Sequence, residues 1–147
     1  MRPVPRDRIR GSLLGGAVGD ALGAPIEFES LRKIRARFGA EGLMELEPAF
    51  GRRGAITDDT QMTLFTAEGL ILAAQDPAFS SRSGLARSVH RAYLRWLRTQ
   101  GERSAHPTFE RTEEGWLLGV EALHSRRDPG NTCLAALREP RMGSAEL

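Results

Sequence analysis

The consecutive residues Thr57, Asp58 and Asp59 are the strongest candidates for chemistry in this 147-residue sequence. A hydroxyl and two carboxylates in one short segment supply hard oxygen ligands, the type that Mg²⁺ and Mn²⁺ prefer. Three ligands do not complete an octahedron, so waters or other residues must supply the rest. The segment also has a purely structural interpretation, in which Thr57 caps a helix and Asp58 forms a capping box with Gln61. Spacing alone leaves both interpretations open.

Two further acids, Asp20 and Glu27, lie in the glycine-rich stretch that runs from residue 11 to residue 28. Asp20 is flanked by glycine and alanine in an apolar helical segment, where a buried carboxylate must be paired or hydrogen-bonded. We expect Asp20 to organise a loop rather than to perform chemistry. Glu27 follows Pro25, which disfavours helical geometry at Ala24, so Glu27 is expected just past a helix end.

The other potentially reactive side chains form no recognisable motif. His90, His106 and His124 are widely spaced and lack the i, i+4 pairing of a zinc site, so they are interpreted as ordinary core or surface histidines. Cys133 lies in an apolar segment with no activating base nearby in sequence, which favours a packing role. The glycine-rich stretch lacks the preceding strand and the Lys-Ser/Thr ending of a P-loop.

Helical periodicity runs through almost the whole sequence, and no segment alternates as a half-buried strand would. The pattern predicts an all-α protein with an irregular segment over residues 39–56. Ser30 and Thr112 are expected to cap helices, and Gly39 and Asp76-Pro77 to end them. The expected helices cover residues 8–22, 30–38, 57–75, 83–99, 112–123 and 131–138.

Glycines recur every four residues in the first expected helix, at positions 11, 15, 19 and 23. This spacing places them on one helix face. Each helical glycine costs about 1 kcal/mol relative to alanine, so the stripe suggests close approach of another backbone. We therefore expect a central, tightly packed helix.

Arginines also recur along one face of the helix expected over residues 83–99, at positions 87, 91, 95 and 98. An apolar stripe that includes Val89, Tyr93 and Trp96 lies on the opposite face. A basic stripe of this kind is typical of a solvated surface, and we interpret it as one.

Composition sets broad limits on the protein class. Lysine and arginine total 21 against 19 acidic residues, and this net charge of +2 is too small to indicate nucleic acid or an anionic membrane as a partner. No apolar run approaches the ~20 residues of a membrane span. A single cysteine excludes an intrachain disulfide, and Asp20 interrupts the apolar stretch that could resemble a signal peptide. These features predict a cytoplasmic protein.

Taken together, three stretches resemble the ADP-ribosylglycohydrolases, the family that includes the dinitrogenase reductase activating enzyme. They are GSLLGGAVGDALGAPIEF at residues 11–28, TDDTQM at 57–62 and PGNTCLAAL at 129–137, the last common in bacterial members. The resemblance covers residues 9–137. It identifies residues 1–147 as the N-terminal part of a single domain of this family.

The resemblance implies an all-α fold with a dinuclear Mg²⁺ or Mn²⁺ centre, in which Thr57, Asp58 and Asp59 are metal ligands. It implies that Glu27 lies near the ribose and assists proton transfer, and that Asp58 or Asp59 shares the role of base through bound water. The implied substrate is an ADP-ribosylated protein, modified on arginine in the bacterial branch, or a small molecule that contains ADP-ribose. The acceptor, the preferred metal and the oligomeric state are left open.

The sequence departs from the family in length, because members are usually about twice as long. Their C-terminal half carries a Gly-Asp-Thr-Asp-Thr-like segment with further metal ligands, which this sequence lacks. We therefore expect the chain alone to bind metal poorly and to show no turnover. The alternative functions are a catalytically silent truncated relative and a lens-crystallin-like structural relative.

Overall fold

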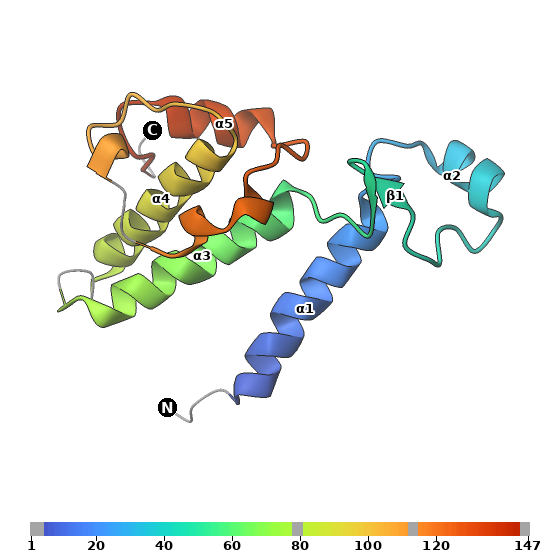
Figure 1. Cartoon of the computed structure of the whole chain (residues 1–147), viewed down its shortest axis with the longest axis horizontal. Helices are drawn as coiled ribbons and strands as arrows, with labels where there is room; N and C mark the ends of the chain where they lie inside the picture. The colour runs from blue at the N-terminus through green and yellow to red at the C-terminus, as the bar shows by residue number, and fades with distance from the viewer. Residues whose placement is uncertain (1–4, 78–80, 112–114, 145–147) are drawn as a thin grey trace. The chain divides into compact units, whose positions relative to one another are not determined.

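The computed structural model describes residues 5–77, 81–111 and 115–144, and among them helices predominate, which confirms the all-α prediction (Figure 1). The chain divides into two compact units, Met1–Thr60 and Gln61–Leu147. The assignment of residues 1–147 to a single domain stays a prediction. No described helix is long and apolar enough to cross a membrane.

The first unit contains helices α1, Arg6–Gly23, and α2, Leu31–Phe38, and the start of α3, Asp58–Gln75. Between α2 and α3, Pro48–Ala49 (β1) pairs antiparallel with Arg52–Arg53 (β2), and the rest of the segment is irregular, as expected. Ser30 caps α2 by accepting a hydrogen bond from the Lys33 amide at 3.4 Å. Gly39, with φ of +81°, ends it as predicted.

Helix α1 extends slightly further than the sequence suggested. Ala24 keeps helical dihedral angles of −48° and −42° before Pro25, and its amide donates to the Asp20 carbonyl oxygen. The proline thus ends the helix without forcing Ala24 into the extended region that a residue before proline prefers. Glu27 follows in a short series of turns, close to where the sequence placed it.

The predicted tight packing of α1 is wrong within the first unit. Among the residues of α1, only Ala21 is buried. A Cβ atom added at Gly11, Gly15, Gly19 or Gly23 would meet no atom of this unit within 4 Å. The glycine spacing therefore reflects no close backbone neighbour in residues 5–60.

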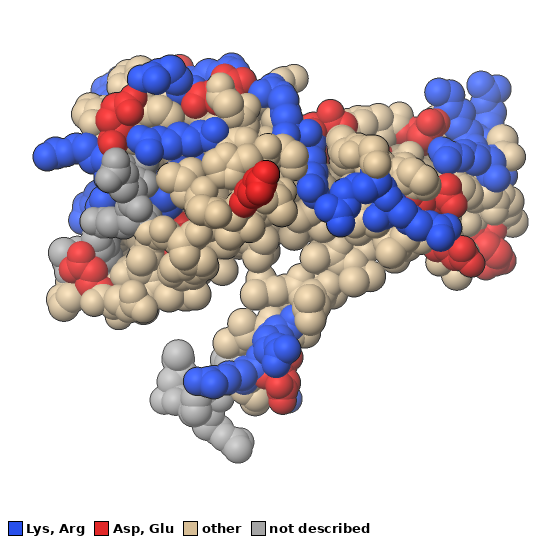
Figure 2. Space-filling model, in the orientation of Figure 1, with Lys and Arg blue, Asp and Glu red and all other residues tan. Residues whose placement is uncertain are grey.

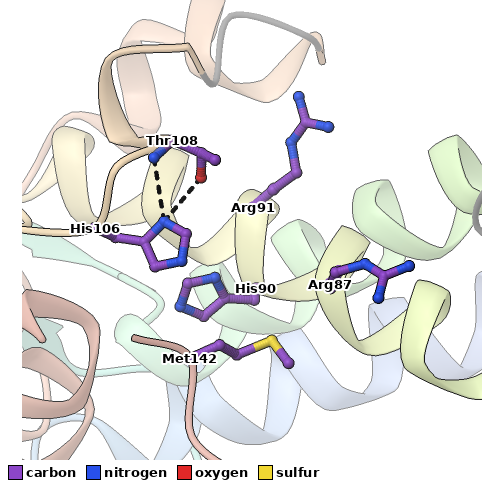
Figure 3. A pocket seen from close by; sticks show the side chains of 6 residues that line it. All are labelled: Arg87, His90, Arg91, His106, Thr108 and Met142. Carbon is purple, nitrogen blue, oxygen red and sulfur yellow. Dashed lines mark hydrogen bonds between the residues drawn. The ribbon is translucent and has the colours of Figure 1, made fainter. Parts of the chain in front are cut away.

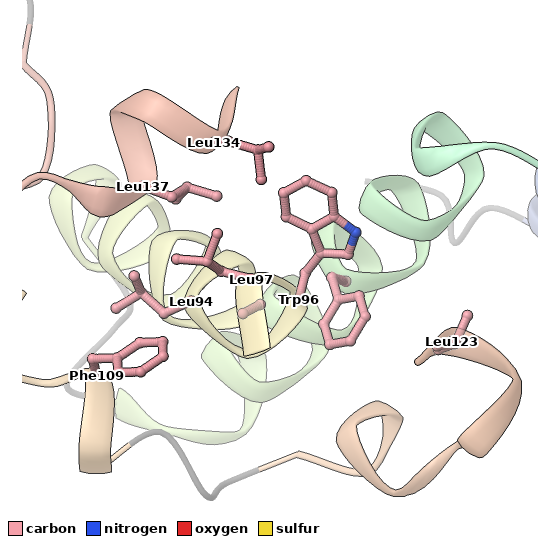
Figure 4. Packing of buried hydrophobic residues seen from close by; sticks show 9 residues of the cluster. Leu94, Trp96, Leu97, Phe109, Leu123, Leu134 and Leu137 are labelled. Carbon is pink, nitrogen blue, oxygen red and sulfur yellow. The ribbon is translucent and has the colours of Figure 1, made fainter. Parts of the chain in front are cut away.

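The second unit is built around α4, Arg82–Thr99, which packs with the remainder of α3 and with α5, Asn131–Arg138. Ser81 caps α4, accepting from the Gly84 amide at 3.0 Å. Figure 4 shows the apolar cluster of this unit, to which α4 contributes Leu94, Trp96 and Leu97 and α5 contributes Leu134 and Leu137. The buried members are Phe65, Ala92, Leu94, Trp96, Leu97, Phe109, Leu123, Leu134 and Leu137.

The helix expected over residues 112–123 is not formed in its described part. Residues 112–114 lie outside the described residues, and the following segment makes two 3₁₀ turns, Leu117–Gly119 and Glu121–Leu123. The amides of Trp116 and Leu117 donate to one oxygen of Glu68, each at 2.7 Å. This tertiary contact fixes the backbone in a course that local periodicity could not predict.

The arginine stripe of α4 is not a uniformly solvated surface, so that prediction is wrong at Arg95. This side chain is 1% exposed, and its Nε and Nη2 atoms donate to Glu68 at 2.9 and 2.6 Å. Arg98 is also partly buried, and its guanidinium lies 4.7 Å from the centre of the Phe109 ring. The surface charges are otherwise mixed, and Figure 2 shows basic and acidic side chains across the visible face.

Candidate functional site

Thr57 immediately precedes α3 and caps it, because its hydroxyl oxygen accepts a hydrogen bond from the Asp59 amide at 3.2 Å. The structural interpretation of this threonine is therefore confirmed. The predicted capping box is wrong, since the Gln61 amide group donates to the carbonyl oxygens of Leu123 and Ser125 and accepts from Trp96.

Asp20 connects α1 to the start of α3. One carboxylate oxygen accepts from the Thr57 hydroxyl at 2.7 Å, and the other accepts from the Thr57 amide at 2.9 Å and from the Thr60 hydroxyl. Both threonines are buried. Three donors satisfy a carboxylate that is only partly exposed, and they hold the residues before α3 against α1. The prediction that Asp20 organises this loop is confirmed.

A hollow of about 370 Å³ opens beside this contact within the first unit. Three carboxylates from separate parts of the sequence line it, those of Asp20, Glu27 and Asp59, together with Gly23, Ala24 and Ile26. Glu27 and Asp59 are exposed. The fold therefore brings two of the predicted site residues to one accessible concave surface.

The remaining two predicted residues lie deeper. Thr57 is 3% exposed and Asp58 is 7% exposed, and neither belongs to the lining of the hollow. Successive residues of a first helical turn point in different directions, which separates the Asp58 side chain from that of Asp59. The predicted ligand set is thus divided between an exposed carboxylate and two buried groups.

The donor chemistry of this region suits a hard divalent cation, although the set is incomplete. A hydroxyl and several carboxylates are the ligand types expected for Mg²⁺ or Mn²⁺. Within residues 5–77, 81–111 and 115–144, no three His, Cys, Asp or Glu side chains are placed to hold a metal ion. The roles of Thr57, Asp58 and Asp59 as metal ligands therefore stay a prediction.

A second pocket, of about 300 Å³, lies in the second unit beside two histidines that sequence spacing kept apart (Figure 3). The rings of His90 and His106 lie 4.8 Å apart between centroids. Burial, and then the neighbouring His106, lower the pKa of His90 to about 4. No sequence signal links these residues, because the loop after α4 brings His106 back to that helix.

The tautomer of His106 follows from its contacts. Its Nδ1 atom accepts from the Thr108 amide at 3.2 Å, so in the neutral ring the proton lies on Nε2. An Nε2 atom that carries a proton cannot ligate a metal. The remaining lining residues are Arg87, Arg91 and Met142, and the two arginine side chains extend away from the pair of rings (Figure 3).

The sequence matches the family described as ADP-ribosylglycohydrolase over residues 1–146. The chain belongs to this family. No solved structure matches it. The family assignment agrees with the resemblance of the three stretches and with the helical architecture.

The individual relatives of the chain agree with its assignment to the ADP-ribosylglycohydrolase family. The chain is 43% identical to the ADP-ribosyl-[dinitrogen reductase] glycohydrolase of Rhodospirillum rubrum over 79 residues, covering 50% of this chain and 24% of that protein. It is 38% identical over 71 residues to the uncharacterized protein YegU of Escherichia coli, covering 44% and 21%. An uncharacterized protein of Archaeoglobus fulgidus is 29% identical over 139 residues, covering 93% and 42%. The chain thus spans less than half the length of each of these relatives.

Proposed function

We propose that this chain forms the N-terminal part of a metal-dependent enzyme that hydrolyses ADP-ribosyl linkages, releasing ADP-ribose from modified arginine side chains. The observation that carries the proposal is the hollow that Glu27 and Asp59 line together with Asp20. The family assignment and the glycohydrolase from Rhodospirillum rubrum support the reaction class. The single cysteine and the absence of a long apolar run in the sequence support a cytoplasmic location.

Mg²⁺ or Mn²⁺ would be held by Thr57, Asp58 and Asp59, with waters and further groups completing the shell. A bound divalent cation would supply Lewis acidity and orient the ribose hydroxyls. Asp59 is exposed and lines the hollow, whereas Asp58 is buried and is not part of its lining.

Glu27 is the proposed proton-transfer group. It lies beyond the end of α1, its side chain is exposed, and it lines the same hollow as Asp59. A carboxylate at this position can accept a proton from an attacking water or return one to the leaving nitrogen at the anomeric carbon. Asp58 or Asp59 would share the role of base through a bound water.

A catalytically silent relative is the second candidate function. The specific observation in its favour is that the described residues contain no complete cluster of metal-ligating side chains. Both candidates retain the Asp20–Thr57 contact, since that contact also serves the fold. Only the enzyme requires Asp58 and Asp59 to bind a cation.

Metal titration separates these functions. In a full-length context, with the C-terminal half of the domain restored, we expect Asp58→Asn and Asp59→Asn each to weaken Mg²⁺ or Mn²⁺ binding measured by calorimetry. Far-UV circular dichroism should show the helices unchanged, because asparagine removes charge but can still accept hydrogen bonds. Asp7→Asn is the matched control, since Asp7 is also an acid in the first turn of a helix. Unchanged affinity in both site variants, alongside the control, would restrict TDDTQ to a helix-capping role.

The reaction itself is tested in a full-length context, with the C-terminal half of the domain restored, by measuring the ADP-ribose released from an ADP-ribosylated arginine substrate in the presence of Mn²⁺. Product formation that requires the metal and falls in both aspartate variants supports the enzyme. Metal binding without product supports the silent relative. Release of ADP-ribose that is the same with and without chelator would contradict the metal-dependent mechanism.

A further inference from the structure

The hydroxyl of Thr57 has almost no hydrogen-bonding capacity left. A threonine hydroxyl carries one proton and two acceptor lone pairs. Its proton is donated to Asp20 Oδ1 at 2.7 Å, and one lone pair accepts the Asp59 amide at 3.2 Å. A single lone pair remains for any further partner.

The direction of the hydroxyl proton is set by Asp20 rather than by Thr57. An ionised carboxylate only accepts hydrogen bonds, so it can never donate to this hydroxyl. Its other oxygen is held by the Thr57 amide at 2.9 Å and by the Thr60 hydroxyl. These contacts prevent the carboxylate from turning away, and they keep the Thr57 proton on the side of α1.

We propose that Asp20 is a positioning residue that makes Thr57 a pure acceptor toward a divalent cation at the start of α3. This inference rests on the proposed function, because it takes Thr57 as a metal ligand. A cation requires a lone pair and is repelled by an outward hydroxyl proton. A carboxylate that accepts the proton of a ligand also raises the basicity of that ligand, as carboxylates do for metal-binding histidines.

Asp20→Asn reverses this arrangement with little change in shape. In the wild type, Asp20 Oδ2 accepts from two donors, the Thr57 amide and the Thr60 hydroxyl. The asparagine amide oxygen can take this position, and the NH₂ group then takes the position of Oδ1, against the Thr57 hydroxyl. The NH₂ group then donates to that oxygen, and the hydroxyl proton must point elsewhere. The variant would therefore convert Thr57 from a cation ligand into a competing donor.

The test is a set of Mn²⁺ titrations of the wild type and its variants, all in a full-length context with the C-terminal half of the domain restored, in which electron paramagnetic resonance measures the free ion. We expect Asp20→Asn to weaken Mn²⁺ binding by roughly 10–100-fold, the usual effect of removing a group that orients a ligand. Thr57→Val should weaken it comparably, and Thr57→Ser should retain it. In the double variant, Asp20→Asn should add nothing to Thr57→Val, because the hydroxyl that it reorients is gone.

Thr60→Val is the matched control, because Thr60 donates to the same carboxylate but not through the proposed ligand. Its Mn²⁺ affinity should stay close to that of the wild type. The inference would be overturned if Asp20→Asn weakened Mn²⁺ binding equally in the wild type and in the Thr57→Val background. The loss of affinity would then follow from charge or loop structure alone. If Thr57→Val weakens binding but Asp20→Asn does not, the inference fails while the proposed metal site stands. Absence of Mn²⁺ binding by the wild type would overturn both.

A metal-free measurement covers the case in which Asp20→Asn does not fold. In the wild-type chain, the Thr57 hydroxyl proton should exchange with water much more slowly than that of the exposed Thr63, as followed by nuclear magnetic resonance. Equal exchange rates for the two hydroxyl protons would show that Asp20 does not hold the Thr57 proton, and would overturn the inference.

Discussion

Glu68→Gln should destabilise the second unit severely, because the Glu68 carboxylate serves four donors. One oxygen accepts from Arg95 Nε and Nη2 at 2.9 and 2.6 Å, and the other accepts from the amides of Trp116 and Leu117 at 2.7 Å each. Glutamine has a single acceptor oxygen, so its NH₂ group must face one pair of donors. The buried guanidinium also loses its counter-charge, since both side chains are at most 1% exposed.

Breaking a buried ion pair by changing one partner costs about 3–5 kcal/mol. For a chain of this size, 1 kcal/mol shifts the melting temperature by roughly 2–4 °C, so we expect a decrease of about 6–20 °C. The decrease in melting temperature is measured by thermal unfolding followed by far-UV circular dichroism. Urea unfolding gives a second measurement of the lost stability. The double variant Glu68→Leu/Arg95→Met should recover part of the loss, because it leaves no buried charge, although two amides stay without an acceptor.

Glu110→Gln is the control for this measurement. Glu110 pairs with Arg103 on the surface, where both side chains are mostly exposed, and such pairs contribute about 0–1 kcal/mol. A melting temperature of Glu68→Gln that matches the control would refute the reasoning. The Glu68–Arg95 pair would then be solvated, and the backbone course of residues 115–117 would need another cause.

Three further outcomes follow from single positions. In a full-length context, with the C-terminal half of the domain restored, Glu27→Gln should reduce turnover of an ADP-ribosylated arginine substrate by about 10²–10⁴-fold without unfolding the protein. Wild-type turnover in the variant would remove Glu27 from the mechanism. Gly69→Ala should lower the free energy of unfolding, measured with urea, by roughly 1–3 kcal/mol, because the new Cβ would lie 2.9 Å from the Val89 Cα. An unchanged free energy of unfolding would mean that α3 and α4 separate freely. The pKa of His90 is lowered from 6.5 to about 4 in the folded chain, so the unfolded chain binds this proton more tightly. The free energy of unfolding should therefore fall as the pH decreases from about 6.5 to 4. His90→Gln should flatten that part of the pH profile, and an identical profile would exclude His90 as its source.

Most helices of this protein could be predicted from the sequence, because their signals are local. Ser30 and Gly39 bound α2 through contacts that span only a few residues, and Pro77 follows the end of α3. Apolar periodicity indicated α4 and α5 for the same reason. The exception is the segment 117–123, where the distant Glu68 side chain determines the backbone.

The candidate site was predicted in part. The types and order of the residues in two stretches suggested Glu27, Thr57, Asp58 and Asp59 as site residues through family resemblance, and their roles stay a prediction. Their exposure could not be predicted, because consecutive side chains in a helical turn face different surroundings. The structure places Asp59 at the hollow and buries Asp58.

By itself, the sequence determined the helical class, the family and the residue types available for chemistry, since these depend on local propensity and on motifs. Only the tertiary structure decided which distant groups meet. Asp20 accepts the Thr57 hydroxyl proton across 37 positions, Glu68 holds Arg95 across 27, and two histidines share a pocket. Hydrogen bonds between residues so far apart depend on how helices pack, and packing reflects the burial of many side chains at once, which no local pattern records.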